Sequence, residues 1–472
     1  MVLLAPGAVV MADYTVQLPT IGATDYNVTV SNSNIDGGAV ASGNGTTNDT
    51  TVINDFLAYA AANGGGTVEI PDTGGGTFLA DELFLGNNTN LQVDTGATLL
   101  YGDKTGGGTL INNLTTSETN VEITGGGTLN GDNKGSNHMI LLQNVTNLAV
   151  NTVTITNSGN EHLVLEGCND VWINGVTIAQ PNNGSNTDGI DFSGNNFLIE
   201  NCNISDGDDD IVAKPEFTAC SNIYIQNITI GNGHGISIGG QTNMGLNGMF
   251  VNNVTINMAS QSNAEGFDFK AGDGTGNGYG GLVQNVTVNN VSINDVDDAI
   301  NISSFYNTAG GGSNSFPGAG APAYTPDSTE PFWKDITFEN IAINDTSSNS
   351  ANIDGLNTNS PTNTDILNFV NITGTNIKNP WDMYFADSVY INGLTQNGVT
   401  INDAQGNYKL NGGNEVSEEA DDTFDATENP VYTVDVPTLV PASVPEPTSV
   451  GIIGAGMLLL LPRRNRSRWG QT

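Results

Sequence analysis

Apolar and polar residues alternate along the middle of the chain, in segments that return at a fixed distance. Each segment joins an alternating strand pattern to a polar turn. The last residues of four consecutive segments lie 26 positions apart: Val171–Ile178, Phe197–Ile204, Ile223–Ile230 and Met249–Ile256. Ile155 continues the series upstream, and Ile293 and Ile343 continue it downstream after longer insertions. A repeat of this length, built from short strands, predicts a solenoid.

The repeat predicts an all-β fold, a right-handed parallel β-helix. No helical pattern lies between the strands, which excludes the helical crossovers of an α/β protein. The alternation places one apolar residue of each coil on a shared inward column: Ile173, Ile199, Ile225 and Val251. An asparagine recurs at the same period, and we interpret the set as a structural ladder at a turn rather than a binding stripe: Asn201, Asn227 and Asn253.

One helix is expected before the repeats. Either Asp49 or Thr50 is placed to cap a helix over Val52–Ala62, and the glycines at 64–66 are placed to end it. A solenoid needs a cap at its end, and this helix is expected to supply it.

The composition of the chain excludes some classes of function. The chain has 472 residues, with 50 acidic and 11 basic side chains and a net charge of −39, and residues 1–462 contain no arginine. Nucleic-acid binding is excluded, because it relies on basic surface. Three cysteines cannot form a disulfide framework. Cys168 and Cys220 are expected two coils apart, roughly 10 Å, too far for a disulfide bond.

The composition also divides the chain into five parts. Residues 1–12 are apolar and end in a small residue, which is typical of a signal-peptide remnant. Residues 13–48 form an N-terminal segment, and 49–405 form the β-helix catalytic domain. Residues 406–444 are acidic and rich in Pro and Thr, as expected of a linker, and 445–472 form a separate tail.

Five consecutive coils share a titratable residue just before an apolar-x-apolar strand: Asp188, Asp209, His234, Glu265 and Asp298. Stacking the strands brings these side chains to one face, with Asp208 beside Asp209. Lys214 and Lys270 fall on another shared column, each three residues after the first apolar residue of its strand. We interpret Glu265 and Asp298 as solvated walls of a cleft, and His138 and His162 as structural.

Crowded carboxylates suit glycoside hydrolysis. Carboxylates about 5 Å apart do not all ionise readily, so at least one is expected to have a raised pKa. Hydrolysis needs one carboxyl group as the acid for the leaving oxygen and another as the base for water. Asp188 and Asp208 lie one coil apart and offset along the chain, so a separation of about 6.5–9.5 Å, which implies inversion, is feasible.

The same residues resemble the motifs of the polygalacturonase family, glycoside hydrolase family 28. The similar segments are Asn186-Thr187-Asp188, Gly207-Asp208-Asp209 and Gly233-His234-Gly235. The resemblance spans about residues 49–400. It implies that Asp208 is the general acid, that Asp188 and Asp209 activate water, and that His234 supports the acid. It also implies a polysaccharide substrate, bound with help from Lys270 and Tyr306, and no cofactor or metal. We place Lys214, which shares the column of Lys270, among the substrate-binding residues as well. We expect a monomer.

Two positions depart from the family pattern. The arginine of the family's RIK motif is replaced by Asp268, which we place with Lys270 among the substrate-binding residues. The cysteine that follows the paired aspartates is replaced by Asp210. Both changes are expected to make the cleft more negative and to repel an anionic polygalacturonate chain unless salt or a cation screens it.

The tail carries a second resemblance. Val444-Pro445-Glu446-Pro447 precedes an apolar stretch to Leu461, followed by Arg463-Arg464-Asn465-Arg466. This order is similar to the PEP-CTERM sorting signal of Gram-negative bacteria. It implies export to the cell surface or beyond, transient membrane anchoring through the tail, and an exosortase-type enzyme as a processing partner.

Two other functions fit the same pattern. A Ca²⁺-dependent polysaccharide lyase often shares the β-helix, and stacked acids bind Ca²⁺ well, but such an enzyme commonly needs an arginine that the body of this chain lacks. A non-catalytic surface β-helix that binds glycan or cations is the other alternative, because a fold alone does not confer function.

Overall fold

The structure is a computed structural model that describes residues 15–102, 108–134, 137–180, 184–258, 264–272, 280–306, 331–354, 364–384, 389–401 and 438–440. One compact unit covers Met1–Ala442, and a second covers Ser443–Thr472. The second unit holds the predicted sorting tail, which lies outside the described residues, as does the predicted signal-peptide remnant. In the described part of the chain, no helix is long and apolar enough to cross a membrane.

The described elements are almost all strands. The first group is β1 (Thr15–Gln17), β2 (Asp25–Asn27), β3 (Asn44–Asn48), β4 (Gly66–Ile70), β5 (Thr77–Ala80), β6 (Leu83–Leu85), β7 (Thr89–Val93), β8 (Thr98–Tyr101), β9 (Ile111–Asn113), β10 (Glu118–Thr124), β11 (Thr128–Lys134), β12 (Ile140–Gln143), β13 (Val145–Asn151) and β14 (Thr154–Ser158). The second group, which carries the regular repeat, is β15 (Leu163–Asn174), β16 (Thr177–Ala179), β17 (Ile190–Glu200), β18 (Asn203–Ser205), β19 (Ile211–Ala213), β20 (Cys220–Ile230), β21 (Ile236–Ile238), β22 (Leu246–Asn257), β23 (Glu265–Lys270), β24 (Leu282–Val296) and β25 (Asp298–Ser303). The last group is β26 (Phe332–Asp354), β27 (Thr364–Tyr384), β28 (Val389–Asn392), β29 (Leu394–Gln396), β30 (Val399–Ile401) and β31 (Thr438–Val440). The helices are α1 (Thr50–Ala62) and a 3-10 turn, Asp36–Gly38.

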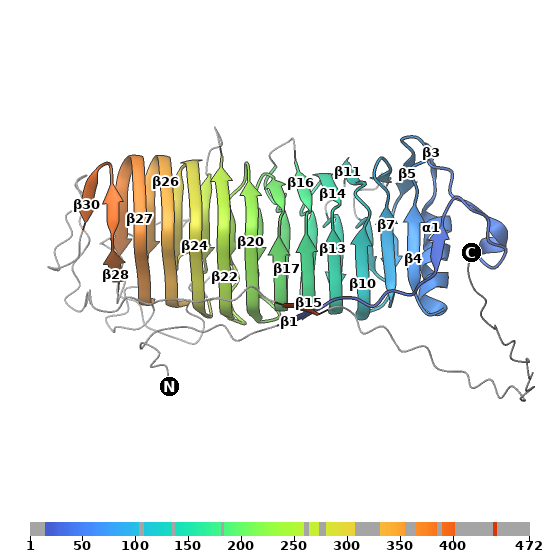
Figure 1. Ribbon diagram of the computed structural model, residues 1–472, viewed down its shortest axis with the longest axis horizontal. Helices are drawn as coiled ribbons and strands as arrows, with labels where there is room; N and C mark the ends of the chain where they lie inside the picture. Colours follow the sequence, from blue (N-terminus) through green and yellow to red (C-terminus); the bar gives the residue numbers. More distant parts are fainter. Residues whose placement is uncertain are drawn as a thin grey trace, which may run out of the picture. The chain divides into compact units, whose positions relative to one another are not determined.

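The strands stack as the 26-residue repeat predicts. The first residues of the four repeat segments align in parallel register, Val171 with Phe197, Phe197 with Ile223, and Ile223 with Met249. Successive coils therefore pair with their neighbours in sequence order along the first unit (Figure 1). The prediction of a right-handed parallel β-helix is confirmed, and the sheet begins before residue 49, because β2 and β3 pair with β4 and β5.

The inward column forms the core of the coils. Its four members align in register and are fully buried: Ile173, Ile199, Ile225 and Val251. Burying each such side chain contributes about 1.5–3 kcal/mol, so the core holds every coil in register with the next. Cys168, Cys202 and Cys220 are buried and free, so Cys168 and Cys220 form no disulfide, as predicted.

The asparagines form the predicted ladder. Asn227 donates its side-chain amide to Asn201 at 3.2 Å, and Asn253 donates to Asn227 at 2.6 Å. All three have a left-handed backbone with φ of 54–57°. Asparagine tolerates that conformation better than other residues with a side chain, so one residue turns the chain and links neighbouring coils.

Helix α1 caps the first coils, but its start differs from the prediction. It begins at Thr50, and Asp49 occupies the N-cap position without a side-chain hydrogen bond to the helix. The Asp49 carboxylate instead accepts hydrogen bonds from Ser42, so it fastens the preceding loop. The helix ends as expected, where Gly65, with φ of 88°, donates its N–H to Ala60.

The first and last strands of the described residues pair on the outside of the coils. Strand β1 pairs in parallel with β31, which lies inside the segment that we assign to a linker. Val16 of β1 packs in a small buried cluster with Leu198, Tyr224 and Phe250. The N-terminal segment is thus anchored to the outer surface of the repeat.

Candidate active site

The predicted titratable column is assembled by strand register. Ile190, Ile211, Ile236, Phe267 and Ile300 align across β17, β19, β21, β23 and β25. Each predicted residue lies two positions before its aligned strand residue, so the five side chains belong to successive coils. Strand stacking therefore gathers groups that are far apart in sequence.

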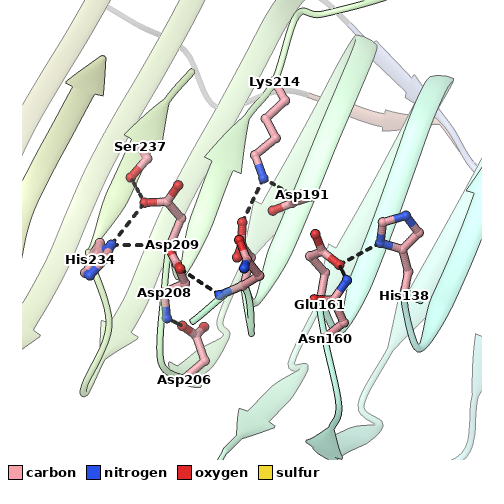
Figure 2. A network of polar contacts seen from close by, with 12 residues as sticks. His138, Asn160, Glu161, Asp191, Asp206, Asp208, Asp209, Lys214, His234 and Ser237 are labelled. Carbon is pink, nitrogen blue, oxygen red and sulfur yellow. Dashed lines mark hydrogen bonds and ion pairs between the residues drawn. The ribbon is translucent and has the colours of Figure 1, made fainter. Parts of the chain in front are cut away.

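Asp208, Asp209 and His234 form the centre of this patch. The Nδ1 atom of His234 lies 3.2 Å from Asp208 Oδ1 and 3.7 Å from Asp209 Oδ1. The second oxygen of Asp208 accepts the backbone N–H of Asn186 at 2.8 Å. Ser237 donates its hydroxyl to Asp209 at 2.8 Å. Figure 2 shows these groups converging from neighbouring coils.

Lys270 links the centre to the next coil. Its ammonium lies 2.9 Å from Asp209 Oδ1 and 2.6 Å from Asp268 Oδ2. Asn301 donates to the other oxygen of Asp268 at 2.7 Å. Tyr306 lies beside the same lysine, with its ring centroid 5.4 Å from Nζ. Lys270 thus orients Asp209 and offers a cationic edge near an aromatic ring.

The structure corrects the expectation that Asp268 and Asp210 add negative charge to an open cleft. Asp268 is 1% exposed and both its oxygens are bonded within the protein, and Asp210 is fully buried. Neither carboxylate faces an open cleft, because Lys270 compensates the first and the protein covers the second. Glu265, expected as a solvated wall, is also buried.

A second ion-pair group lies on the preceding coil. Lys214 Nζ lies 2.7 Å from Asp188 Oδ2 and 2.6 Å from Asp191 Oδ2 (Figure 2). Asp188 is 4% exposed, and its main-chain oxygen accepts the N–H of His162. The ammonium of Lys214, which we predict to bind substrate, therefore holds the Asp188 carboxylate in place.

Two further carboxylates lie beneath the centre. Asp206 accepts the N–H of Asp208 at 3.0 Å, and Asp210 accepts the N–H of Gly235 at 2.9 Å. Both are fully buried. A Cβ atom added at Gly233 would overlap the Asp210 carboxylate, so only glycine fits before His234. These acids fix the turns that present Asp208 and His234.

The surroundings of Asp208 and His234 favour a charged pair. Burial acts to raise the pKa of Asp208, but the hydrogen bond and charge of His234, with the Asn186 N–H, lower it to about 2. Burial acts to lower the pKa of His234, but the bond to Asp208 and the charges of Asp209 and Asp208 raise it above its usual value. The two shifts favour a proton on His234 and an ionised Asp208.

Five other acids of the patch shift in the opposite direction. Burial raises the pKa of Asp188 to about 6, with the positive charge of Lys214 opposing it and the charges of Asp209 and Asp208 adding to it. Burial also raises the pKa values of Asp206, Asp210, Asp191 and Glu265 well above the usual range. The crowded patch contains the raised carboxyl pKa that the sequence predicts.

The central triplet also has the composition of a metal site. One ligand atom from each of Asp208, Asp209 and His234 lies within 4.8 Å of the others. Carboxylate oxygens and imidazole nitrogen are ligands for several divalent ions. The ion pair with Lys270 places a positive charge beside Asp209 Oδ1, which disfavours a second cation there.

Sequence reasoning missed several partners. Asp191, Ser237 and Asn301 each follow the aligned apolar residue of their strand by one position, in register with Asp268. Their shared position is the signal that identifies them, because strand alternation turns this whole column to the face that carries Lys214 and Lys270.

Residues 67–380 match the family model of glycosyl hydrolases family 28. The chain belongs to this family. The match covers the full titratable column and both lysines.

Named relatives agree with that membership. A polygalacturonase of Juniperus ashei is 35% identical over 189 residues, which are 39% of this chain and 36% of the relative. The chain spans well under half the length of the first curated relatives that it matches.

Solved structures share the fold. An exopolygalacturonase from Thermotoga maritima aligns with a TM-score of 0.66 and 17% identity, over 82% of this chain and 95% of that one. PfbA, a surface adhesin of Streptococcus pneumoniae, aligns with a TM-score of 0.58 and 16% identity, over 81% and 97% of the two chains. The fold alone is therefore compatible with an enzyme or an adhesin.

Proposed function

We propose that this protein is a polygalacturonase-like hydrolase that cleaves pectic polysaccharide. The observation that carries the proposal is the Asp208–His234 pair, 3.2 Å apart, set beside Asp209 in a chain of this family. An adhesive surface needs no proton held between an imidazole and a carboxylate, whereas hydrolysis needs a proton donor at the leaving oxygen.

Asp208 delivers the proton in the proposed reaction. The proton on His234 Nδ1, which lies 3.2 Å from Asp208, passes to Asp208 and from Asp208 to the leaving glycosidic oxygen as the bond to the anomeric carbon breaks. Asp208 ends the step as a carboxylate, and solvent returns a proton to His234. The low pKa of Asp208 belongs to the state in which His234 carries the proton, so the pair acts as one acid.

Asp188 and Asp209 activate the water. The water oxygen bonds to the anomeric carbon and its proton passes to one of the two carboxylates. Lys270 and Ser237 orient Asp209, and Lys214 orients Asp188. This mechanism inverts the anomer, provided that acid and base are about 6.5–9.5 Å apart.

Two observations favour other functions. The triplet Asp208, Asp209 and His234 converges enough for a cation, as a Ca²⁺-dependent lyase requires, and the fold is shared with an adhesin. Lyase action gives unsaturated products that absorb ultraviolet light and stops in EDTA. A non-catalytic protein binds glycan without releasing reducing ends.

One experiment separates the three. The protein is incubated with polygalacturonate, methyl-esterified pectin and rhamnogalacturonan, and the first product is followed by proton NMR. Release of the inverted anomer, unaffected by EDTA, supports the proposal. A retained anomer contradicts the mechanism, and unsaturated product contradicts hydrolysis.

We also propose that the protein is exported as a monomer and processed at its tail. The support is the order of Val444–Pro447, the apolar stretch and the arginines. Expression in a Gram-negative host with and without an exosortase tests it: loss of residues after about 445 only with the enzyme present is the expected result. An uncleaved tail in both hosts contradicts it.

A further inference from the structure

A pocket of about 210 Å³ lies beside the ion pairs of Lys214. Its charged lining is His138, Glu161, Glu166, Asp191, Lys214 and Glu216. Ligand pockets for drug-sized molecules span about 300–1,000 Å³, so this one suits a single small polar unit. His138, which the sequence places among structural residues, is thus part of a concave surface next to Asp188.

Both basic side chains of the pocket are already engaged. Lys214 bonds to Asp188 and Asp191, and His138 Nδ1 lies 2.8 Å from Glu161. Glu166 and Glu216 form no ion pair within the described residues. A ligand that carries a carboxylate therefore meets surplus negative charge and no cation free of a carboxylate partner.

Asp191 offers the pocket a polar contact of its own. It is 5% exposed, and its Oδ1 atom is buried without a hydrogen-bond partner in the described residues, while Oδ2 holds Lys214. Burial raises the pKa of Asp191 well above its usual range. The unpartnered Oδ1 is a hydrogen-bond acceptor, and a sugar hydroxyl placed against it satisfies it.

Aromatic and aliphatic surface completes the pocket. Phe217 is 74% exposed at its edge, and Leu165 and Phe192 are buried in its wall. An exposed aromatic ring beside a few polar groups is typical of small-molecule sites. The apolar C–H face of a sugar ring packs well against this surface, whereas a hydrated carboxylate does not.

We propose that this pocket is a saccharide subsite that takes a neutral sugar unit, one without a free carboxylate, in preference to a galacturonate unit. The proposal rests on the proposed function, because the pocket shares Lys214 with Asp188. A cation site is disfavoured, since within the described residues only Asp208, Asp209 and His234 gather closely enough to share an ion.

The test compares galacturonate oligosaccharides of one length as free acids and as methyl esters. Binding is measured by calorimetry on the full chain carrying Asp208→Asn, and kcat/KM is measured on the wild type. The test variant combines Glu166→Gln with Glu216→Gln. Glu339→Gln, on β26 and outside the pocket lining, is the matched control for lost negative charge.

The ester is expected to bind more tightly than the acid at low salt. The double variant is expected to reduce that preference about three- to tenfold by improving binding of the acid alone, with no change from Glu339→Gln. Adding salt reduces the preference only where Glu166 and Glu216 remain. Phe217→Ala is expected to weaken both forms equally.

Two results overturn the subsite: tighter binding of the free acid by the unaltered pocket, or an equal change from Glu339→Gln. Failure of the proposed function looks different. In that case neither oligosaccharide is hydrolysed by the wild type, although the calorimetric preference for the ester persists.

Discussion

Two columns of polar side chains run through the same coils of this β-helix and are satisfied in opposite ways. In the asparagine column, Asn201, Asn227 and Asn253 bond to one another, stay exposed and carry no charge. In the other column every coil carries a titratable residue, Asp188, Asp209 and then His234. Charged neighbours cannot bond to one another as an amide ladder does, so they recruit partners from other positions. Repetition of one neutral residue marks structure here, and a column of titratable residues marks chemistry.

The largest difference between the two columns is expected from Asp208→Asn, which changes a residue beside the titratable column. The amide cannot donate a proton to the leaving oxygen or form an ion pair with His234, so we expect activity to fall by about 10²–10⁴-fold. Reducing ends released from a pectic polysaccharide measure the loss, and circular dichroism checks the fold. Wild-type turnover in a folded Asp208→Asn protein would refute the assignment of the acid.

The charged column is expected to make stability depend on pH, which a neutral ladder does not. Asp188, Asp206 and Asp210 have folded pKa values raised above the unfolded ones. Their stabilisation is complete below the unfolded pKa and is lost as pH rises through the folded pKa. His234 acts in the same direction, while Asp208, lowered to about 2, loses its contribution only in strong acid.

We therefore expect Tm to be higher at pH 5 than at pH 8 by about 2–5 °C, measured by calorimetry. Asp206→Asn combined with Asp210→Asn is expected to flatten the difference. An unchanged slope in that double variant, or a Tm that rises with pH, argues against buried carboxyls as its source.

Lys214→Gln tests the link between the two ion-pair groups. The charge of Lys214 lowers the pKa of Asp188, which burial holds at about 6. Its removal raises that pKa further, so we expect the acid limb of kcat/KM to move to higher pH. Lys134→Gln, whose partner is the exposed Asp132, is the control and leaves the profile in place. An acid limb that moves to lower pH disproves the link.

The smallest effect is expected in the ladder itself. Asn227→Ala removes two amide hydrogen bonds and places alanine at φ of 54°, so we expect a loss of about 1–2 kcal/mol in unfolding free energy. Activity at 25 °C stays unchanged, measured beside the denaturation curve. A large loss of activity without loss of stability would show that the ladder binds substrate.

Periodicity predicts most of the fold, because each coil meets only its neighbours and the 26-residue spacing fixes the register. It also predicts that Asp208, Asp209 and His234 converge. Partner choice is less predictable: Lys214 bonds Asp188 on the preceding coil, while Lys270 bonds Asp209 two coils back. Both lysines share one column, so the difference depends on side-chain conformation and burial rather than on spacing.

The burial of individual carboxylates is the second property that the sequence does not predict. Asp210 and Asp268 replace neutral and basic residues of the family pattern, and sequence alone counts them as added negative charge in a cleft. The structure buries both. Alternation predicts which way a strand residue points, but turns such as the one around Asp210 have no such period.

Strands β17, β19 and β21 each contribute one part of the site. The consequence of adding a coil to the solenoid therefore depends on where the coil is inserted. A duplicated coil before β15 or after β25 lengthens the molecule and leaves the reacting groups together. The same duplication between β17 and β19 moves Asp188 one strand spacing, about 4.8 Å, away from Asp208 and separates acid from base. Coils can therefore be gained or lost on either side of the five coils that carry the site without separating the reacting groups. A gain or loss within those five coils separates them.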